Sequence, residues 1–327
     1  MKLGEYKVRC YTKVIACCFL TTLLLTGCEA PLNLAAVEAQ RAQSIQRIDF
    51  YQSMVANGDE LIAVGNNGLV IASEDGEIWQ RQTLPDAASL LKVAACPSGE
   101  TIALSFDNNI WLKQPGGSQW QSLAIPTNEQ LMDVTCAPDG SWWVAGSFST
   151  IMHSTDSGAN WQTFSLQEDA IITNIAFVND TDAVASAEYG MILSSTDGGQ
   201  NWDVTGYLPD EFYPHGMYFS SLQNGWISGL NGYIYATEDG GETWTKEAVD
   251  TAVPVYQLVT ANDQLLGLGE NTTVLRRNAA GNWTTIVSPS APVYLRAAAT
   301  SADGVTHVVG GRGVYLALTS SMTGSQE

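Results

Sequence analysis

A chain of 327 residues that is 45% hydrophobic and 15% charged is too apolar to be disordered, and it is long enough for one large or two ordinary globular domains. Its formal net charge of −20 argues against binding nucleic acid or an anionic lipid surface. No Lys or Arg lies between Lys113 and Lys246. We therefore expect an acidic sector in the middle of the chain and a smaller basic one near its end.

The first residues have the pattern of a targeting segment. Four basic residues, Lys2, Lys7, Arg9 and Lys13, precede an apolar run of twelve, residues 14–25, which is too short to span a bilayer. Leu25-Thr26-Gly27-Cys28 follows and resembles a bacterial lipobox. The resemblance implies that residues 1–27 are a lipoprotein signal peptide, that Cys28 carries lipid, and that the chain faces the periplasm from the outer membrane. An ordinary secretory signal is the alternative.

The composition changes twice after this segment. Residues 28–47 are rich in Ala and Gln without strand alternation, which predicts a lipid-anchored linker. From residue 48, apolar strands recur about every eight to twelve residues with Gly, Asn and Asp between them, a pattern typical of all-β folds. We expect one β domain over residues 48–320 and a short tail, 321–327.

A cassette ending in tryptophan repeats through this domain. Its pattern is Ser/Thr-x-Asp-x-Gly-x-x-Trp, with three full copies and one copy that is a residue shorter. The members are Ser154, Asp156, Gly158 and Trp161; Ser195, Asp197, Gly199 and Trp202; Thr237, Asp239, Gly241 and Trp244; and, in the short copy, Asp75 and Trp79. Trp79, Trp120, Trp161, Trp202, Trp244 and Trp283 are spaced by 41, 41, 41, 42 and 39 residues. Four strands in about 40 residues is the size of a propeller blade.

Counting these units predicts a seven-bladed β-propeller with four-stranded antiparallel blades. The blades begin near Ile48, Ser89, Gln130, Ala170, Phe212, Pro254 and Pro292. The seventh ends before a fourth strand, which would leave unpaired strand edges. We expect a segment within residues 36–47 to supply the ring-closing strand.

The cassette has a mechanical explanation. Its Asp is expected to accept bonds from backbone amides two residues on, its Gly to adopt positive φ, and its Ser or Thr hydroxyl to add a local bond. The tryptophan would fill the space between strands. The pattern resembles the Asp-box, or BNR repeat, of sialidases and other propellers. That resemblance implies a structural role for the four aspartates.

Two cysteines remain beyond Cys28. Cys96 and Cys136 lie 24 and 25 residues before their respective tryptophans, at nearly equivalent positions of neighbouring blades. An oxidising compartment would permit a disulfide between them. The alternative is two small buried side chains too far apart to bond.

No catalytic or metal site is predicted. A sialidase-like enzyme would need three arginines from different blades, a Tyr nucleophile paired with Glu, and an Asp acid, and its Arg-Ile-Pro motif is absent. His153, His215 and His307 have no second ligand at zinc spacing. We expect no cofactor and no metal.

Two groups of residues are candidates for partner binding. Phe212, Tyr213 and His215 lie in the irregular connector between blades four and five, where exposed aromatics would suit protein binding. Packing of these aromatics against blade five is the alternative. Arg276, Arg277, Arg296 and Arg312 could form a basic surface, or could merely balance charge on strand faces.

Residues 216–244, and less closely residues 48–320, resemble propellers of the photosystem II stability and assembly factor family. Asn224-Gly225-Trp226, the strand at 232–235 and the box at 237–244 carry the resemblance. It implies a non-catalytic periplasmic or thylakoid-lumenal scaffold that binds partly assembled membrane proteins. Photosynthetic members use an arginine-rich patch, whereas the middle blades here have no basic residue.

We therefore predict a lipid-anchored, monomeric, non-enzymatic envelope propeller that acts as a protein-binding scaffold or as an assembly or stability factor for a membrane protein complex. Two other functions stay open. One is a sialidase-like or other glycan-acting or glycan-binding propeller, and the other is a purely structural envelope protein.

Overall fold

The computed structural model describes residues 33–86, 88–287 and 291–319. The predicted signal peptide, Cys28 and the tail lie outside these ranges. The chain divides into two units, residues 1–43 and 44–327. In the first, α2 (Ala35–Arg41) buries none of its side chains. No helix in the described ranges is long and apolar enough to cross a membrane.

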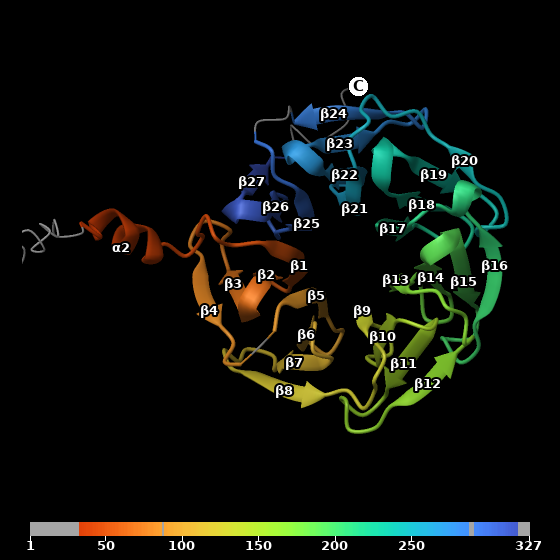
Figure 1. Ribbon diagram of the computed structural model, residues 1–327, viewed down its shortest axis with the longest axis horizontal. Coiled ribbons are helices and arrows are strands. Elements are labelled where there is room, and N and C mark those ends of the chain that lie inside the picture. Colours follow the sequence, from red (N-terminus) through yellow and green to blue (C-terminus); the bar gives the residue numbers. More distant parts are fainter. Residues whose placement is uncertain (1–32, 87, 288–290, 320–327) are drawn as a thin grey trace, which may run out of the picture. The chain divides into compact units, whose positions relative to one another are not determined.

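The second unit is a seven-bladed β-propeller, as predicted (Figure 1). Six blades have four antiparallel strands and the seventh has three among the described residues. The strands are, blade by blade, β1 (Tyr51–Asn57), β2 (Glu60–Gly65), β3 (Leu69–Ser73), β4 (Gln80–Thr83); β5 (Leu90–Ala95), β6 (Thr101–Ser105), β7 (Asn109–Lys113), β8 (Trp120–Ala124); β9 (Leu131–Cys136), β10 (Trp142–Gly146), β11 (Thr150–Ser154), β12 (Gln162–Ser165); β13 (Ile172–Phe177), β14 (Ala183–Ala187), β15 (Met191–Ser195), β16 (Asp203–Tyr207); β17 (Gly216–Phe219), β18 (Gly225–Ser228), β19 (Ile234–Thr237), β20 (Thr245–Lys246); β21 (Val255–Ala261), β22 (Gln264–Gly269), β23 (Val274–Arg277), β24 (Trp283–Val287); and β25 (Leu295–Thr300), β26 (Thr306–Gly310), β27 (Tyr315–Leu318).

Strand direction gives the ring two distinct faces. Each blade starts with its innermost strand and ends with its outermost one (Figure 1). Because neighbouring strands are antiparallel, the turn between the second and third strands lies on the same face as the connection to the next blade. We call this the turn face. The cassettes join the third and fourth strands and lie on the opposite face, which we call the box face.

The second strands of the blades are rich in small and branched side chains, with Trp142 and Trp143 in β10 and Trp226 in β18 as large exceptions. Every residue of β6, β10, β14 and β26 is buried. Gly146 ends β10 where a Cβ atom would collide with the backbone carbonyl of Gln130, so the strand can approach its neighbour only because the residue is glycine. Apolar side chains of neighbouring blades pack together, as where Trp143 of blade three joins Ile175 of blade four.

Ring closure differs from the prediction. Residues 36–47 contribute no strand; residues 35–41 are helical and β27 has no outer partner among the described residues. The segment around Asp49 instead takes the place of an inter-blade connection. The amide of Gly313 donates to the carbonyl of Asp49 at 2.8 Å, just as Gly68 donates to Ala88 at 3.1 Å. The poor strand propensity of the Ala- and Gln-rich segment explains why it adds no strand.

A buried polar cluster fixes this closing segment. The Asp49 carboxylate accepts hydrogen bonds from the Arg81 guanidinium at 2.8 Å, the Tyr51 hydroxyl at 3.0 Å and the backbone amide of Gln46 at 2.7 Å. We call the boundary between blades one and seven the seam. Apolar contacts complete it, because Tyr51 and Trp79 of blade one share a core cluster with Ala297 and Val309 of blade seven. Packing and side-chain bonds therefore close the ring in place of strand exchange.

The Asp-boxes have the structural role that their pattern predicts. In the box of blade four, the Asp197 carboxylate accepts from the Ser195 hydroxyl at 2.8 Å and the Asn201 amide at 3.0 Å, while the Trp202 indole donates to the carbonyl of Gly199. The sequence predicted that the aspartate would accept from a backbone amide two residues later. That prediction is wrong for this full box, where the donating backbone amide, that of Asn201, lies four residues after Asp197. In the short copy, Asp75 does accept from Glu77. One residue fewer tightens the turn enough to bring that amide into reach.

Candidate functional site

Backbone bulges single out one position near the start of the innermost strands. The register shifts in six blades at this position, leaving one residue unpaired with the second strand. The six residues are Gln52, Leu91, Met132, Thr173, Tyr256 and Arg296. Because the innermost strands line the ring, a bulge there presents a side chain to the centre. In blade five, which has no such bulge, His215 precedes the innermost strand.

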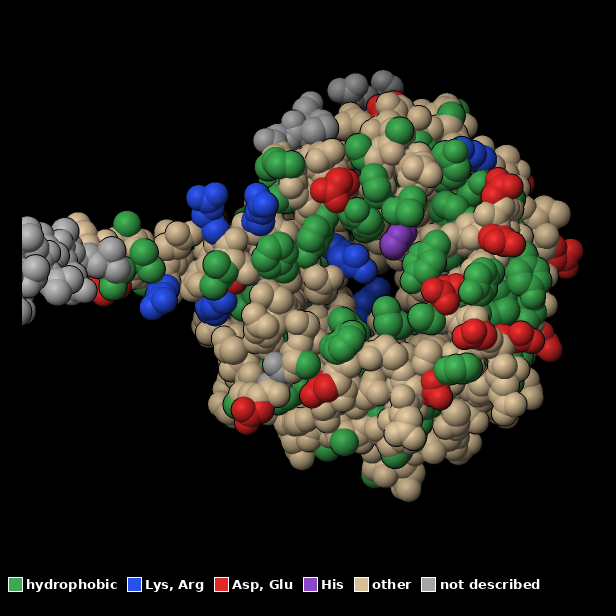
Figure 2. All heavy atoms as spheres, viewed as in Figure 1, with side chains coloured by type: hydrophobic (Ala, Val, Ile, Leu, Met, Phe, Trp, Pro, Cys, Tyr) green, Lys and Arg blue, Asp and Glu red, His purple; other side chains and the backbone are tan. Residues whose placement is uncertain are grey.

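Aromatic side chains surround one cation at this level, near the turn face. The rings of Tyr213 and His215 have centroids 5.1 Å apart, those of His215 and Tyr256 are 5.6 Å apart, and those of Tyr256 and Tyr294 are 6.3 Å apart. The Arg296 guanidinium lies 5.9 Å from the centroid of the Tyr256 ring. We call these five residues the mouth. Figure 2 shows Lys and Arg side chains in the central hollow and a His at its rim.

Arg296 has no carboxylate partner among the described residues. It forms none of the ion pairs found there, and it donates to no described hydrogen bond. Burial lowers its pKa, and the nearby oxygens of Tyr294, Tyr256 and Tyr213 only partly offset that effect. Burial and the Arg296 charge also lower the pKa of His215. The mouth therefore holds a positive charge that forms no ion pair with a described residue, beside a neutral imidazole.

The tyrosine hydroxyls are arranged as donors. The Gln52 amide donates to the Tyr294 hydroxyl at 3.1 Å, which leaves the Tyr294 proton free to donate elsewhere. Tyr213 makes no hydrogen bond with a described residue through its hydroxyl. The Tyr256 hydroxyl donates to Glu270 at 2.9 Å, and burial together with this bond raises the pKa of Tyr256 to about 12. A tyrosine held protonated in this way is a poor nucleophile.

The structure brings the two predicted groups of binding residues together only in part. Tyr213 and His215 of the connector join Arg296 in the mouth. Phe212 instead packs edge-on against Tyr235 of blade five, as the alternative interpretation of the connector expected. Arg312 is exposed in a turn of blade seven. The predicted basic surface is therefore not one surface.

Arg276 and Arg277 lie elsewhere, where β23 approaches the box face. Both line a groove of about 610 Å³ between blades five and six. The Arg277 guanidinium pairs with Glu247 and lies 4.8 Å from the Trp226 ring centroid. Arg277 therefore balances the charge of Glu247 on the strand surface, which was the alternative to a binding role.

Sequence reasoning missed Gln52, Tyr256 and Tyr294. Their common signal is position: each lies within two residues of the start of an innermost strand, where Arg296 also lies. Aligning the blades on their tryptophans would have placed Gln52 and Tyr256 at the same position, 27 residues before Trp79 and Trp283, but blade seven has no tryptophan with which to align Tyr294. The bulges that present them leave no mark in the sequence pattern.

The turn face also carries most of the exposed large apolar side chains. Eight of the ten in residues 44–319 lie in its turns and connections or, for Tyr207, at the strand end beside one: Ile48, Phe50, Phe106, Phe148, Tyr189, Tyr207, Tyr213 and Leu230. Figure 2 shows hydrophobic side chains around the central hollow. Asp and Glu line the rim beside β16 and β20 in the same view, where the sequence predicted an acidic sector.

Deeper in the ring, the charges are compensated. Lys92 lies 3.6 Å from the buried carboxylate of Asp133, which also accepts from the backbone amides of Val134 and Ile175. Burial raises the pKa of Asp133 although Lys92 opposes the shift. This pair ties the innermost strands of three blades, whereas Arg296 in the mouth has no such carboxylate partner among the described residues.

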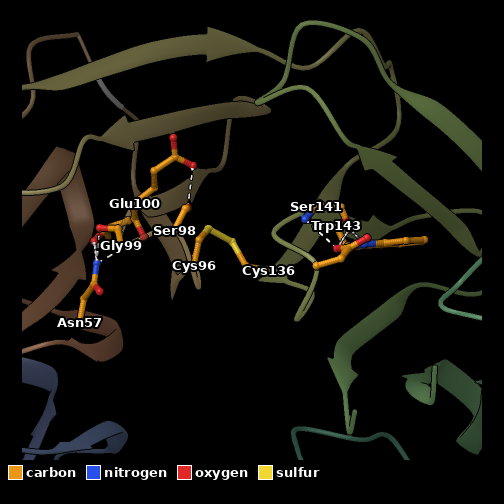
Figure 3. The surroundings of a disulfide bond; sticks show 10 residues. Asn57, Cys96, Ser98, Gly99, Glu100, Cys136, Ser141 and Trp143 are labelled. Carbon is orange, nitrogen blue, oxygen red and sulfur yellow. Dashed lines mark hydrogen bonds between the residues drawn. A yellow bond between two sulfur atoms is a disulfide. The ribbon is translucent and has the colours of Figure 1, made fainter. Parts of the chain in front are cut away.

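The innermost strands of blades two and three are joined at their box-face ends. Cys96 and Cys136 form a disulfide with Cα atoms 5.1 Å apart (Figure 3). Equivalent positions of neighbouring blades can be this close because innermost strands converge on the ring axis. The alternative of two cysteines too far apart is therefore wrong.

The histidines do not gather. His153 stacks on Trp143 with ring centroids 4.3 Å apart, and His307 is buried beside Tyr315, so both pack within strands. Among the described residues, no group of three or more His, Cys, Asp or Glu side chains could hold a metal ion.

Comparisons with known proteins agree with this architecture. Residues 112–211 match the family model described as photosynthesis system II assembly factor YCF48. No curated protein matches the sequence. Similar solved structures include YCF48 from Cyanidioschyzon merolae, with a TM-score of 0.68 and 15% identity over 84% of this chain and 96% of that one.

Two further structures share the fold. YCF48 bound to D1 peptide has a TM-score of 0.69 and 16% identity over 85% of this chain and 94% of that one. Virginiamycin B lyase from Staphylococcus aureus has a TM-score of 0.71 and 13% identity over 85% and 97%. The matched segment, the seven blades and the Asp-boxes together identify the chain as a seven-bladed propeller like the photosystem II assembly factors.

Proposed function

We propose that this protein is a non-catalytic, protein-binding propeller that supports the assembly or stability of a membrane protein complex, and that its turn face is the binding surface. The observation that carries the proposal is the gathering of eight exposed large apolar side chains on that face, around a cation that forms no ion pair with a described residue. Apolar patches of this kind mark interaction sites, and aromatics and Arg dominate binding energy at protein interfaces. The likeness to a protein that is titled as bound to a D1 peptide supports the same class of partner.

We further propose lipid attachment at Cys28 and a position on the periplasmic side of the outer membrane. The support is the lipobox-like Leu25-Thr26-Gly27-Cys28. A tethered chain would meet membrane proteins during their assembly. A Cys28→Ser variant should lose labelling by a clickable fatty acid and leave the membrane fraction. Unchanged labelling would contradict this part.

The binding experiment uses the full chain carrying a photo-crosslinker at exposed Phe148. We expect a defined membrane protein to be captured in its partly assembled form, and the level of the assembled complex to fall when the gene is deleted. The control places the crosslinker at exposed Ile78 on the box face. Capture of the same protein equally from both positions, or no effect of deletion, would refute the proposal.

A glycan-acting enzyme is the second candidate, because Arg296, Tyr256 and Glu270 converge as an Arg, a Tyr and a Glu. Two observations weigh against it. The described mouth holds one arginine, where a sialidase-like site needs three, and the high pKa of Tyr256 disfavours the nucleophilic form. Hydrolysis of a sialoside that is lost in Tyr256→Phe would reverse this conclusion.

A further inference from the structure

We propose that the mouth binds a single carboxylate carried by an otherwise apolar segment of the protein partner. The inference rests on the proposed function and adds the chemical identity of the group that the turn face recognises. The residues that carry it are Arg296, Tyr294, Tyr213 and His215.

The mouth offers donors without matching acceptors. Arg296 has five N–H groups and no described hydrogen-bond or ion-pair partner, although its guanidinium lies over the Tyr256 ring. The bond from Gln52 leaves the Tyr294 proton free to donate, and Tyr213 has no described hydroxyl partner. A carboxylate supplies two oxygens that fit a guanidinium bidentately, with room for hydroxyl donors on the remaining lone pairs. A cationic or purely apolar group would leave this arrangement unsatisfied.

The ligand site is preorganised by its neighbours. Edge-to-face packing holds His215 against Tyr256 at 89° between ring planes and Tyr256 against Tyr294 at 86°. Glu270 anchors the Tyr256 hydroxyl, so that this ring serves as a wall beneath the guanidinium. Little side-chain entropy is then lost when a carboxylate binds.

The surroundings limit how much negative charge the ligand can carry. Glu188 raises the pKa of Tyr213 through its charge, and Glu270 acts in the same direction on Tyr294 and Tyr256, so these carboxylates lie close to the mouth. The whole chain has a net charge of −20. A polyanion would be repelled, while one carboxylate flanked by apolar side chains would suit both Arg296 and the exposed Tyr189, Phe148 and Leu230 of the same face.

The test uses purified protein and two probes that differ only at their end: the acetylated tripeptide Leu-Ala-Leu with a free terminal carboxylate, and the same peptide with a terminal carboxamide. We expect the carboxylate peptide to bind at least about tenfold more tightly, because hydrogen bonds to a charged group are worth that much. Binding is followed by NMR of the His215 ring. The carboxylate should raise the pKa of His215 by offsetting the Arg296 charge, and the carboxamide should not.

The matched variants are Arg296→Met, which removes the charge and keeps a long apolar side chain, and Arg312→Met, which alters an exposed arginine of the same blade. The tighter binding of the carboxylate peptide should be lost in Arg296→Met and kept in Arg312→Met. Equal binding of both peptides to the unmodified protein, or a preference that survives Arg296→Met, would overturn the inference. An acetylated triglutamate that binds more tightly than the apolar carboxylate would overturn its single-charge part.

The outcomes separate the two proposals. If the crosslinker at Phe148 captures a membrane protein but the peptides show no preference, the function stands and the carboxylate inference fails. If the preference is present and no membrane protein is captured, the mouth is an anion site whose partner is not a membrane protein.

Discussion

Each Asp-box aspartate lies at the surface with a strongly bonded carboxylate; Asp75 and Asp156 are exposed, and Asp197 and Asp239 are partly buried. Asp197 accepts from Asn201 through both backbone and side chain and from the Ser195 hydroxyl, and these bonds lower its pKa to about 2. The same arrangement lowers the pKa of Asp239 to about 2. The charged form is therefore the one that holds the turn.

An Asp197→Asn substitution should lower the Tm at neutral pH, because the amide cannot accept from the Asn201 side chain and the Ser195 hydroxyl as an ionised carboxylate does. A lowered folded-state pKa gives stability that is present above the unfolded pKa of about 3.9 and lost as the pH falls through about 2. The Tm difference should thus shrink between about pH 4 and pH 2.

The control for this prediction is Asp203→Asn, the exposed aspartate that begins β16 beyond the box. It should leave the Tm nearly unchanged. A Tm difference for Asp197→Asn that stays constant down to pH 2 would contradict the role given to the carboxylate.

Innermost strands carry the features that concern function. They converge on the axis, which lets bulged residues from different blades meet in the mouth and lets Cys96 and Cys136 bond across a blade boundary. The outermost strands follow the Asp-boxes instead, as β16 follows the box of Asp197 and Trp202.

Removing the disulfide should destabilise the propeller by about 2–4 kcal/mol, since the bond closes a long loop in the unfolded chain. The check is a Cys96→Ala, Cys136→Ala variant compared with the oxidised and the reduced protein by urea unfolding. The reduced protein should match the variant. If the oxidised protein is no more stable than either, the bond contributes nothing to the ring.

The whole ring depends on a seam that differs from the other blade boundaries. Blade seven lacks a fourth strand among the described residues, and Asp49 holds the closing segment through Arg81, Tyr51 and Gln46. Closure therefore rests on apolar packing between blades one and seven, a few side-chain bonds and one backbone bond to Gly313.

An Asp49→Ala substitution should cost about 3 kcal/mol, because it removes the ion-pair partner of the half-buried Arg81 guanidinium, which keeps only the Ser44 carbonyl among its described partners, and leaves the buried Tyr51 hydroxyl without its acceptor. Hydrogen–deuterium exchange should rise in β1, β26 and β27. The control, Glu247→Ala, removes the partner of Arg277 and should raise exchange near β23 and β24 instead. Equal exchange at the seam in both variants would refute this account of closure.

The seam should also weaken in mild acid. His307 is buried between the Ser301 and Tyr315 hydroxyls, the Tyr315 hydroxyl donates to the carbonyl of Gly76 in blade one, and burial lowers the pKa of His307 although Asp303 opposes the shift. Asp75 and Glu77 lie near Tyr315.

Because the folded-state pKa of His307 is lowered, this histidine binds more protons in the unfolded chain. Its contribution to folding stability is therefore complete above the unfolded pKa of about 6.5 and falls as the pH drops below that value. Exchange in β26 and β27 should thus rise between about pH 7 and pH 5.5, and His307→Gln should remove most of that pH dependence. His153→Gln, a lowered-pKa histidine away from the seam, should leave it in place. Hydrogen–deuterium exchange in β26 and β27 that does not change with pH would contradict the role of His307.

Sequence alone determined the seven blades, their order and the Asp-box turns, because each follows from residues close together in the chain: a turn needs Asp, Gly and Trp within eight positions, and the period of about 41 residues repeats it. Even the incomplete seventh blade was visible. Only the tertiary structure decided the rest. The mouth joins residues from several blades, such as His215, Tyr256 and Arg296, and the disulfide and the seam likewise join distant residues. No local pattern records those contacts, because ring closure and strand bulges set the distances between blades.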